Sequence, residues 1–263
     1  MNKKVLRTCV ELMFSLLPFR FVMKLVRVLL SSQGFGSGAR VRTSGELKAA
    51  RFFLGDDIQK PITIFDVGAN RGEYTSAILA LYPSSRVFSF EPSRETFRLL
   101  EVEFAAMSQV FKLNYGLGVK SQSQLLYKEG QYARIASLTP LDVIDPDYTE
   151  KVIIRTLDEV VSEYSISEID LLKIDVEGHE LDVLKGAQNT LSLRKIKFLQ
   201  FELGGASIET NTTLKDIYDM LSKYDYRLYL ISRRGIVPLD TYDYQFEQYS
   251  TTNFFAELRE KSV

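Results

Sequence analysis

The sequence is poor in the residues that build disulfides and metal sites. Its 263 residues include one cysteine, one histidine and no tryptophan. A single cysteine, Cys9, excludes an internal disulfide framework and a cysteine-rich zinc site. A single histidine, His179, excludes a metal site made from several histidines of one chain. The sequence also lacks an excess of charge of one sign, since its formal net charge is −1. This gives no reason to expect a nucleic-acid partner.

Long apolar runs are absent as well. Charged residues interrupt every such run well before the ~20 residues that a membrane-spanning helix needs. Arg7 and Glu11 also break the apolar stretch that a cleaved signal would need, and no small-residue cleavage site follows. We therefore expect a cytoplasmic protein, either free or peripheral to a membrane. The length and the hydrophobic content of 45% suit one globular domain with an appendage.

The first 32 residues form a basic, amphipathic segment. They contain six Lys or Arg and one acid, Glu11, and Pro18 divides them into two predicted helices. In the second helix Arg20, Lys24 and Arg27 share one face, while apolar residues occupy another. Two alternatives remain open. The helices lie on a membrane surface, or they pack on the main domain or on a second subunit.

Residues 61–263 alternate strand and helix patterns and form the main predicted domain. Residues 33–60 before it predict a glycine-containing linker and one short helix. The predicted strands cover residues 62–66, 86–91, 110–114, 169–175, 198–203, 226–231 and 253–258. The predicted helices cover residues 73–81, 95–106, 157–164, 180–191 and 212–224, and residues 120–138 predict a β-hairpin that residues 152–155 could join. Strands separated by such helices imply right-handed crossovers and a mostly parallel sheet.

The first informative junction is ITIFDVGANRG (62–72), where an apolar strand ends in a carboxylate and a glycine turn. Asp66 ends the strand, and Gly68 and Gly72 flank the turn into a helix. Glycine lets the backbone approach a ligand closely, and the helix N-terminus that follows favours negative ligand groups. About 25 residues later Glu91 ends the next strand, where an acid can accept hydrogen bonds from both ribose hydroxyls. Turn and acid together predict an adenosine-containing cofactor.

The turn itself, GANRG (68–72), discriminates between cofactors. A dinucleotide site normally has three glycines, and Asn70 stands where the middle one is expected, which suits a pyrophosphate poorly. The turn suits a ligand whose amino-acid end lies over it, because Asp66 can meet an ammonium and backbone N–H groups can meet a carboxylate. An NAD-dependent Rossmann oxidoreductase remains an alternative, which Asn70 disfavours.

The second junction, LLKIDVEGHELDVLKGA (171–187), is the most informative part of the sequence. Its apolar strand ends in Asp175, Glu177 and His179 around a glycine, and a helical pattern follows. Open α/β sheets bind ligands outside the carboxyl ends of their strands, so these side chains are expected beside the glycine turn. The two junctions therefore predict one nucleotide-type pocket with a reaction centre next to it.

At this point the motifs resemble a known family. DVGANRGEYT (66–75), FSFEPS (88–93), NYGLG (114–118), TLDEV (156–160) and the 171–187 segment resemble the FkbM-type methyltransferases. These are S-adenosylmethionine-dependent O-methyltransferases, which implies an α/β, Rossmann-like, seven-stranded and mostly parallel sheet flanked by helices, here with an N-terminal helical extension. The resemblance covers roughly residues 62–203 in order, and NFFAEL (253–258) resembles the closing strand.

The resemblance also implies roles for individual residues. The methionine part of the cofactor would lie against Asp66, Gly68, Asn70 and the turn closed by Gly72; the ribose against Glu91; and the adenine against Pro92, Ser93, Asn114, Gly116 and Leu117. Asp175, Glu177 and His179 would face the methyl acceptor, and Asp175 could touch cofactor and acceptor alike. The family acts mostly on hydroxyls of sugars and of sugar-decorated or polyketide products. We therefore expect a small-molecule or glycan acceptor with a free hydroxyl.

An alcohol is a weak nucleophile, so a base within hydrogen-bond reach would help the transfer. His179 is the natural candidate because an unperturbed imidazole titrates near neutrality, and Asp175 and Glu177 could orient the hydroxyl or the ring. Alternatively, His179 is a helix-start residue that bonds nearby backbone. The same three side chains could ligate a metal ion. No second histidine is available, however, so we expect no metal site. A last alternative is a non-catalytic binding module recruited to a membrane through residues 1–32.

Overall fold

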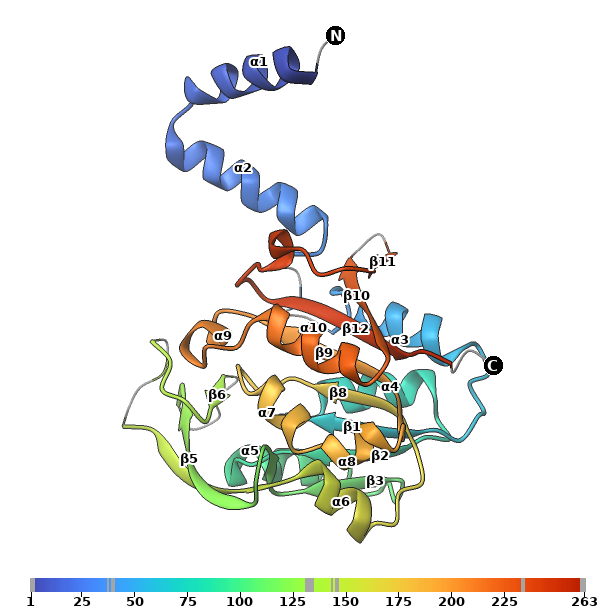
Figure 1. Ribbon diagram of the computed structural model, residues 1–263. Helices are drawn as coiled ribbons and strands as arrows, with labels where there is room; N and C mark the ends of the chain where they lie inside the picture. Colours follow the sequence, from blue (N-terminus) through green and yellow to red (C-terminus); the bar gives the residue numbers. More distant parts are fainter. Residues whose placement is uncertain are drawn as a thin grey trace.

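Eight strands form the central sheet, in the spatial order β11-β10-β12-β9-β8-β1-β2-β3 (Figure 1). The computed structural model describes residues 3–36, 38, 41–130, 135–142, 144, 147–232 and 235–260. The strands are β1 (Thr63–Val67), β2 (Arg86–Phe90), β3 (Val110–Leu113), β8 (Ile169–Ile174), β9 (Ile196–Leu203), β10 (Tyr226–Ser232), β11 (Gly235–Leu239) and β12 (Thr252–Leu258). Strands β1, β2, β3, β8 and β9 pair in parallel, whereas β12 is antiparallel to its neighbours β9 and β10.

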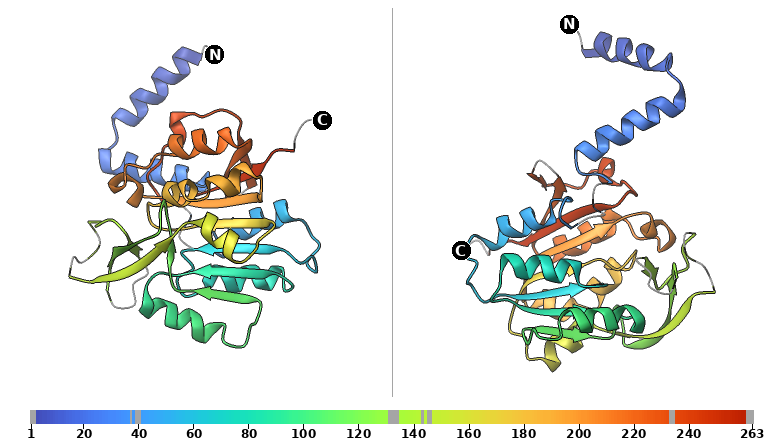
Figure 2. Two further views of the ribbon diagram at one scale, coloured as in Figure 1. Left: turned by 60° about the horizontal axis from the view of Figure 1, so that its bottom comes forward. Right: turned by 180° about the vertical axis from the view of Figure 1, so that it is seen from behind.

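Helices cover both faces of this sheet (Figure 2). One face packs on α3 (Glu46–Leu54), α4 (Glu73–Leu81) and α5 (Arg94–Glu103). The other packs on α6 (Leu157–Glu163), α7 (Glu180–Lys185), α8 (Gln188–Ser192) and α10 (Leu214–Lys223). The short helices α9 (Ala206–Glu209) and η1 (Tyr244–Phe246) lie in connections. Because successive strand residues point to opposite faces, Ile64 belongs to the first core and Phe65 to the second, which explains the continuous apolar run of β1.

The strand order reverses between β1 and β8. From β1 the chain proceeds to β2 and β3 on one side, and β8 then pairs with β1 on its other side. In open α/β sheets ligands bind outside the carboxyl ends of the strands at such a switch point. Those ends are Val67 on β1, Phe90 on β2 and Ile174 on β8. The glycine turn, Glu91 and Asp175 therefore meet at one edge of the sheet.

A second sheet of four strands, in the order β4-β7-β5-β6, stands beside this edge. Its strands are β4 (Gly116–Leu117), β5 (Gln122–Lys128), β6 (Ala136–Ser137) and β7 (Thr149–Arg155). Strand β5 is antiparallel to both β6 and β7, which confirms the predicted hairpin and its third strand. The loop predicted near Gly130 continues into residues 131–134, which lie outside the described residues.

The N-terminal helices α1 (Lys3–Ser15) and α2 (Phe19–Ser32) project from the domain as an arm (Figures 1 and 2). Pro18 is the N-cap residue of α2, so the predicted division into two helices is confirmed. No residue of α2 is buried, which argues against the alternative that the helices pack on the main domain. Within the described residues, no helix is both long enough and apolar enough to cross a membrane.

The predicted α/β fold with its mostly parallel sheet and flanking helices is confirmed, and the sheet carries an eighth strand. This strand, β11, pairs antiparallel with β10 at the sheet edge and contains Pro238, which an edge strand tolerates. The helix predicted over residues 180–191 is divided into α7 and α8 around Gly186. There the chain passes so close to Gly118 that a Cβ at Gly186 would lie 2.0 Å from the Gly118 carbonyl oxygen.

Candidate active site

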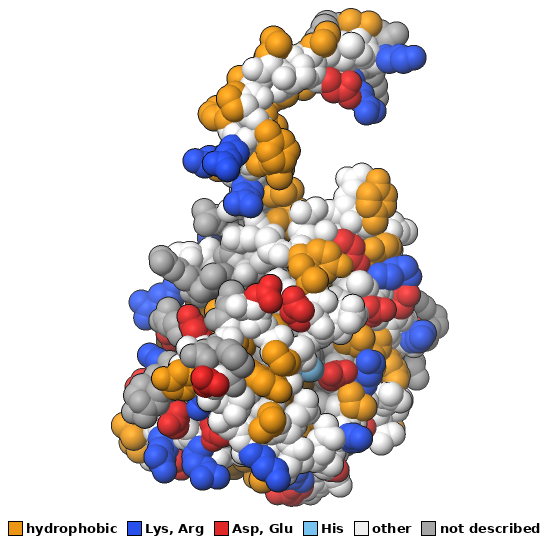
Figure 3. All heavy atoms as spheres, turned by 90° about the vertical axis from the view of Figure 1, so that its left-hand side faces the viewer, with side chains coloured by type: hydrophobic (Ala, Val, Ile, Leu, Met, Phe, Trp, Pro, Cys, Tyr) orange, Lys and Arg blue, Asp and Glu red, His pale blue; other side chains and the backbone are white. Residues whose placement is uncertain are grey.

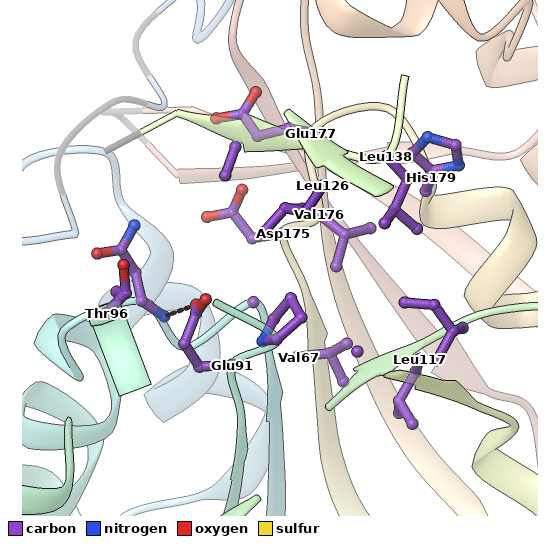
Figure 4. Close-up of a pocket in the computed structure, with 16 residues that line it drawn as sticks. Val67, Glu91, Thr96, Leu117, Leu126, Leu138, Asp175, Val176, Glu177 and His179 are labelled. Carbon is purple, nitrogen blue, oxygen red and sulfur yellow. Dashed lines mark hydrogen bonds between the residues drawn. The ribbon is translucent and has the colours of Figure 1, made fainter. Parts of the chain in front are cut away.

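A cleft with two chambers occupies the switch point, and Figure 4 shows the narrower chamber. The narrow chamber encloses about 790 Å³ and the wide chamber about 2120 Å³, both counting space open to solvent. Gly68, Asn70, Asp175 and Glu177 line both chambers and mark where they join. The wide chamber is the larger of the two, so it leaves room for a second ligand beside one bound in the narrow chamber.

Gly68 allows the ends of β1 and β8 to meet. Its φ of 83° lies in the left-handed region, and its N–H donates to the carbonyl oxygen of Phe90 at 3.0 Å. A Cβ at this position would lie 1.8 Å from the backbone oxygen of Asp175, a contact that no side chain can make. The turn therefore needs glycine both for its backbone conformation and for its close approach to the reaction centre.

Glu91 is held by backbone N–H groups at the floor of the narrow chamber. It is 6% exposed; Oε2 accepts from the Asn70 N–H at 3.0 Å, drawn in Figure 4, and Oε1 accepts from the Ser93 N–H at 2.8 Å. Burial raises the pKa of Glu91 to about 7, although these two N–H bonds favour the ionised form. Each carboxylate oxygen keeps a further lone pair, so the group can still accept from ligand hydroxyls.

Apolar side chains also line the narrow chamber. Side chains from both sheets contribute to it, namely Val67, Pro92, Leu117, Leu126, Leu138, Ile154 and Val176. Gly116 also lines it, and a Cβ there would lie 2.9 Å from the Ile154 side chain, so the backbone forms the wall directly. The narrow chamber therefore combines apolar walls with the buried carboxylate of Glu91 and with the acids Asp175 and Glu177.

Four residues expected to bind the cofactor do not line the cleft. Gly72 is packed against Phe104, whose ring would lie 2.3 Å from a Cβ at Gly72. Ser93 donates its N–H to Glu91, and the side-chain amide of Asn114 donates to the backbone oxygen of Glu91 at 3.0 Å. These residues shape the turns that hold the cleft, so their expected contacts with the methionine or the adenine are not supported.

Asp66 is the fourth of these residues. It is fully buried, and Oδ2 accepts the hydroxyl hydrogen of Thr75 at 2.7 Å. Burial raises the pKa of Asp66, with the charge of Lys173 opposing the rise. Oδ1 has no hydrogen-bond partner among the described residues. The expected direct contact of Asp66 with an ammonium stays a prediction, and the complete burial of the side chain counts against it.

A buried lysine organises the wide chamber. Lys173 Nζ lies 2.9 Å from Asp175 Oδ2 and 5.0 Å from the centroid of the Tyr74 ring. Burial disfavours its charge, but the neighbouring carboxylates of Asp175, Asp66 and Glu46 outweigh that effect and raise the pKa of Lys173. The structure places it in the chamber wall, where it fixes the Asp175 carboxylate.

No role was predicted for Glu46, although residues 33–60 were predicted to contain a short helix as well as a linker. It starts α3 and lines the wide chamber, and its Oε1 accepts from the side-chain amide of Gln200 at 2.6 Å. Glu202 lies in the same wall, where burial and then the charge of Asp175 raise its pKa to about 9. Within the described residues, no group of three His, Cys, Asp or Glu side chains is arranged to hold a metal ion.

Asp175, Glu177 and His179 do not all face the same way. The side chains of Asp175 and Glu177 point to one side in Figure 4, whereas the His179 ring lies on the other side beside Leu138. The turn at Glu177 (φ 51°) and Gly178 (φ 99°) separates them. His179 lines the narrow chamber, and it is not among the residues that line the wide one. The expectation that His179 faces the acceptor is therefore not supported.

Both ring nitrogens of His179 have partners. Nε2 lies 3.1 Å from the Thr139 hydroxyl, and Nδ1 lies 3.0 Å from Asp182 Oδ2. Sequence reasoning missed Asp182, although it lies three residues after His179 in the same motif, a spacing that brings side chains together on a helix. Through these two contacts His179 links Asp182 on α7 to Thr139, in the segment that follows β6.

Glu180 is a buried acid at this edge of the sheet, and its burial should make the stability of the protein depend on pH. It is 2% exposed; Oε1 accepts from the Val176 and Gly178 N–H groups, both at 3.2 Å, and Oε2 has no partner among the described residues. Burial raises the pKa of Glu180 from 4.5 to about 8. The folded state thus binds this proton more tightly than the unfolded chain, and the stability it contributes is lost as pH rises from 4.5 to about 8.

Glu180→Gln is therefore expected to be less sensitive to alkali than the parent protein. The parent should lose about 1.4 kcal/mol of unfolding free energy per pH unit from this group between about pH 5 and 8. Glutamine keeps an acceptor oxygen for the two N–H groups and has no charge to bury. Urea unfolding at several pH values measures this, and a difference between the two proteins that does not vary with pH would contradict it.

Comparisons with known proteins agree with the geometry of the cleft. The chain matches the methyltransferase FkbM domain over residues 66–228. Hexuronic acid methyltransferase AglP of Haloferax volcanii is 31% identical over 180 residues, 68% of this chain and 69% of that protein. The 2-O-methyltransferase NoeI of Sinorhizobium fredii is 28% identical over 206 residues, 73% of this chain and 83% of that protein. Among solved structures, fibrillarin of Aeropyrum pernix aligns with a TM-score of 0.42 and 13% identity, over 80% of this chain and 74% of that chain.

The matched region contains the glycine turn, Glu91 and the segment from Asp175 to His179, which are the parts that build the cleft. It confirms the resemblance stated from the sequence motifs. The alternatives of an NAD-dependent oxidoreductase and of a non-catalytic module are not supported. This chain belongs to the FkbM methyltransferase domain family and is an S-adenosylmethionine-dependent methyltransferase.

Proposed function

We propose that this enzyme methylates a hydroxyl group of a sugar, either free or within a glycan. The observation that carries the proposal is the wide chamber, lined by several acidic side chains, that opens from the junction at Asp175 and Glu177. A sugar presents many hydroxyl donors, and the chamber wall offers acidic side chains whose oxygens can accept them, namely Glu46, Asp175, Glu177 and Glu202. The names of two relatives support this, since AglP acts on a hexuronic acid and NoeI is a 2-O-methyltransferase.

In this proposal the narrow chamber binds the cofactor and the wide chamber binds the acceptor. The bound cofactor supplies an activated methyl group, so the chain must mainly align the acceptor oxygen and exclude water. Glu91 accepts hydrogen bonds from the ribose hydroxyls, and Pro92 and Leu117 border the adenine. Gly68 and Asn70 lie against the methionine end. The acceptor enters through the wide chamber, and its hydroxyl meets the cofactor at the junction.

The geometry favours Glu177, rather than His179, as the base that takes the hydroxyl proton. Glu177 lines both chambers, and burial followed by the charge of Asp175 raises its pKa to about 7, against the influence of Lys173. Such a carboxylate is partly ionised near neutral pH, where a general base is most effective. His179 is then a positioning residue, whose ring joins Asp182 to Thr139.

Glu177→Gln is expected to lower turnover by ~10²–10⁴-fold, because an amide cannot take the proton. At saturating S-adenosylmethionine, where the ionisation of Glu91 no longer limits binding, kcat/KM for the acceptor should rise in the parent enzyme up to about pH 7 as Glu177 ionises. The variant should lose that rise. His179→Ala should keep the rise and most of the turnover. Initial rates between about pH 5.5 and 8.5 measure both effects. Glu209→Gln is the control, since it removes an exposed carboxylate from the same chamber.

The assignment of the base is wrong if His179→Ala removes the pH dependence and Glu177→Gln keeps it. The function itself is tested by incubating the purified enzyme with methyl-labelled S-adenosylmethionine and a panel of sugars and glycans. The expected product carries the label on a sugar oxygen, identified by nuclear magnetic resonance. Label found only on nitrogen or on a carboxylate would contradict the proposal.

A further inference from the structure

The arm formed by α1 and α2 exposes large apolar side chains (Figure 3). Leu16 is 86% exposed, Phe19 77%, Val28 65% and Leu12 63%. The arm meets the domain at the end of α2, where Leu30 packs against the main core. Soluble monomers rarely leave contiguous apolar surface of this kind uncovered, so the arm is built for a partner.

The polar face of the arm carries positive charge. Residues 1–32 hold six Lys or Arg and one acid, a net charge of +5 (six minus one). The acid, Glu11, is itself paired, with Arg7 Nε 2.7 Å from Glu11 Oε1. On α2, Arg20, Lys24 and Arg27 share one helical face, opposite the apolar one. The partner must therefore match a surface that is apolar on one side and basic on the other.

Three occupants of this surface can be compared: the domain, a second copy and a membrane. Most large apolar side chains of the arm are exposed, so the domain of the same chain does not cover its apolar surface. A second copy would bring two arms of net charge +5 together, and their like charges would oppose the contact. Anionic lipids instead neutralise the charge while acyl chains cover the apolar face. Helices of 13 and 14 residues are too short to span a bilayer, which takes ~20, and long enough to lie on it.

We propose that the arm lies in the interfacial region of an anionic membrane and anchors the enzyme there. Its apolar faces enter the boundary between headgroups and acyl chains, and its basic faces remain among the headgroups. The Pro18 joint between the helices lets both lie in one plane along the surface.

The arm joins the domain next to the wide chamber. A Cβ at Gly34 would lie 2.6 Å from the Ile231 carbonyl oxygen, so the chain is held tightly against β10. Gly38 then donates its N–H to the Thr251 oxygen at 3.0 Å, and both residues line the wide chamber. An anchored arm therefore keeps this chamber beside the bilayer. The acceptor would be a sugar displayed on a membrane lipid, a consequence that rests on the proposed function, whereas the anchoring does not.

Co-sedimentation of the full chain with vesicles tests the anchoring. Vesicles of phosphatidylcholine with about one third phosphatidylglycerol should bind the protein, more weakly as salt rises, and pure phosphatidylcholine should bind it poorly. The triple variant Arg20→Glu, Lys24→Glu, Arg27→Glu should bind the anionic vesicles at least ~10²-fold more weakly.

Two further variants separate the arm from charge in general and from folding. The matched control Arg98→Glu, Lys120→Glu, Lys151→Glu reverses three exposed cations of the main domain and should bind like the parent. Leu16→Gln combined with Phe19→Gln should also lose vesicle binding, because it removes apolar surface that the domain does not cover. S-adenosylhomocysteine binding, measured by calorimetry, should stay unchanged in every arm variant, which shows that the domain is folded.

Two results would overturn the proposal: a parent protein that does not sediment with anionic vesicles, and arm and domain variants that lose binding equally. A dimer in analytical ultracentrifugation that the arm variants dissociate, without vesicle binding, would assign the arm to a second copy instead. Vesicle binding by the active-site variant Asp175→Asn keeps this test independent of the proposed reaction.

Discussion

Replacing Glu91 by alanine should weaken the binding of S-adenosylhomocysteine by ~10²-fold or more. The proposal has the Glu91 carboxylate accept two ribose hydroxyls, and hydrogen bonds to a charged group are worth ~1.5–3 kcal/mol each. The carboxylate is already buried and oriented by the Asn70 and Ser93 N–H groups, so binding costs little further ordering. Isothermal calorimetry with S-adenosylhomocysteine measures the effect without turnover.

Glu91→Ala should also destabilise the fold, so a second variant, Glu91→Gln, is needed to test the ligand contact alone. Glu91→Ala leaves two buried N–H groups unsatisfied, at a cost of ~1–3 kcal/mol each. Glu91→Gln keeps an acceptor oxygen and removes the charge, so it should be better folded and still bind poorly. Glu101→Ala, which changes an exposed acid on α5, is the control. A folded Glu91→Gln protein with normal affinity would remove Glu91 from ribose binding.

The raised pKa of Glu91 gives this prediction a pH dependence. Because ribose hydroxyls donate to the ionised carboxylate, binding favours loss of its proton. Affinity should therefore rise about tenfold per pH unit below about 7 and level off above it. Glu91→Gln has no such proton and should show a flatter profile. An affinity in the parent enzyme that falls as pH rises through 7 would mean that the neutral acid binds the ligand.

The cofactor end of the cleft could be predicted from the sequence because its signals are local. Glycine turns and strand-end acids lie within a few residues of each strand terminus, as with Gly68 and Glu91. The alternating pattern then implies a parallel sheet, whose carboxyl ends meet at one edge. These signals predict that Gly68, Asn70, Glu91 and Asp175 lie in one cleft, and in the structure all four line the narrow chamber.

The acceptor end could not be predicted in the same way, because its contacts join distant segments. Glu46 meets Gln200 across 154 positions in the sequence, and no local pattern pairs them. The direction of His179 depends on a positive φ at Glu177, a residue type that rarely adopts one. Strand periodicity would place residues 175, 177 and 179 on one side, and this turn breaks that periodicity. The strand-end position of Asp66 likewise did not indicate that its side chain is fully buried.

Asp175→Asn is expected to lower turnover by ~10²–10³-fold while S-adenosylhomocysteine affinity changes far less. Asp175 lies where the two chambers join, its backbone N–H donates to the Val67 oxygen at 3.0 Å, and Lys173 holds its carboxylate at 2.9 Å. The charge is thus fixed before any ligand arrives, which is the arrangement that stabilises charge developing during a transfer. Asparagine keeps the shape and removes that charge.

The control for Asp175→Asn should change another carboxylate of the wide chamber and leave the shape of the chamber unchanged. Asp142→Asn does so, because Asp142 is an exposed residue of the wide chamber, and its turnover should stay near normal. Loss of the ion pair with Lys173 also lowers stability, so thermal unfolding is measured beside the rates. If Asp175→Asn melts earlier yet turns over normally at a temperature where it is folded, Asp175 is a structural partner of Lys173 and the reacting groups are aligned without its charge.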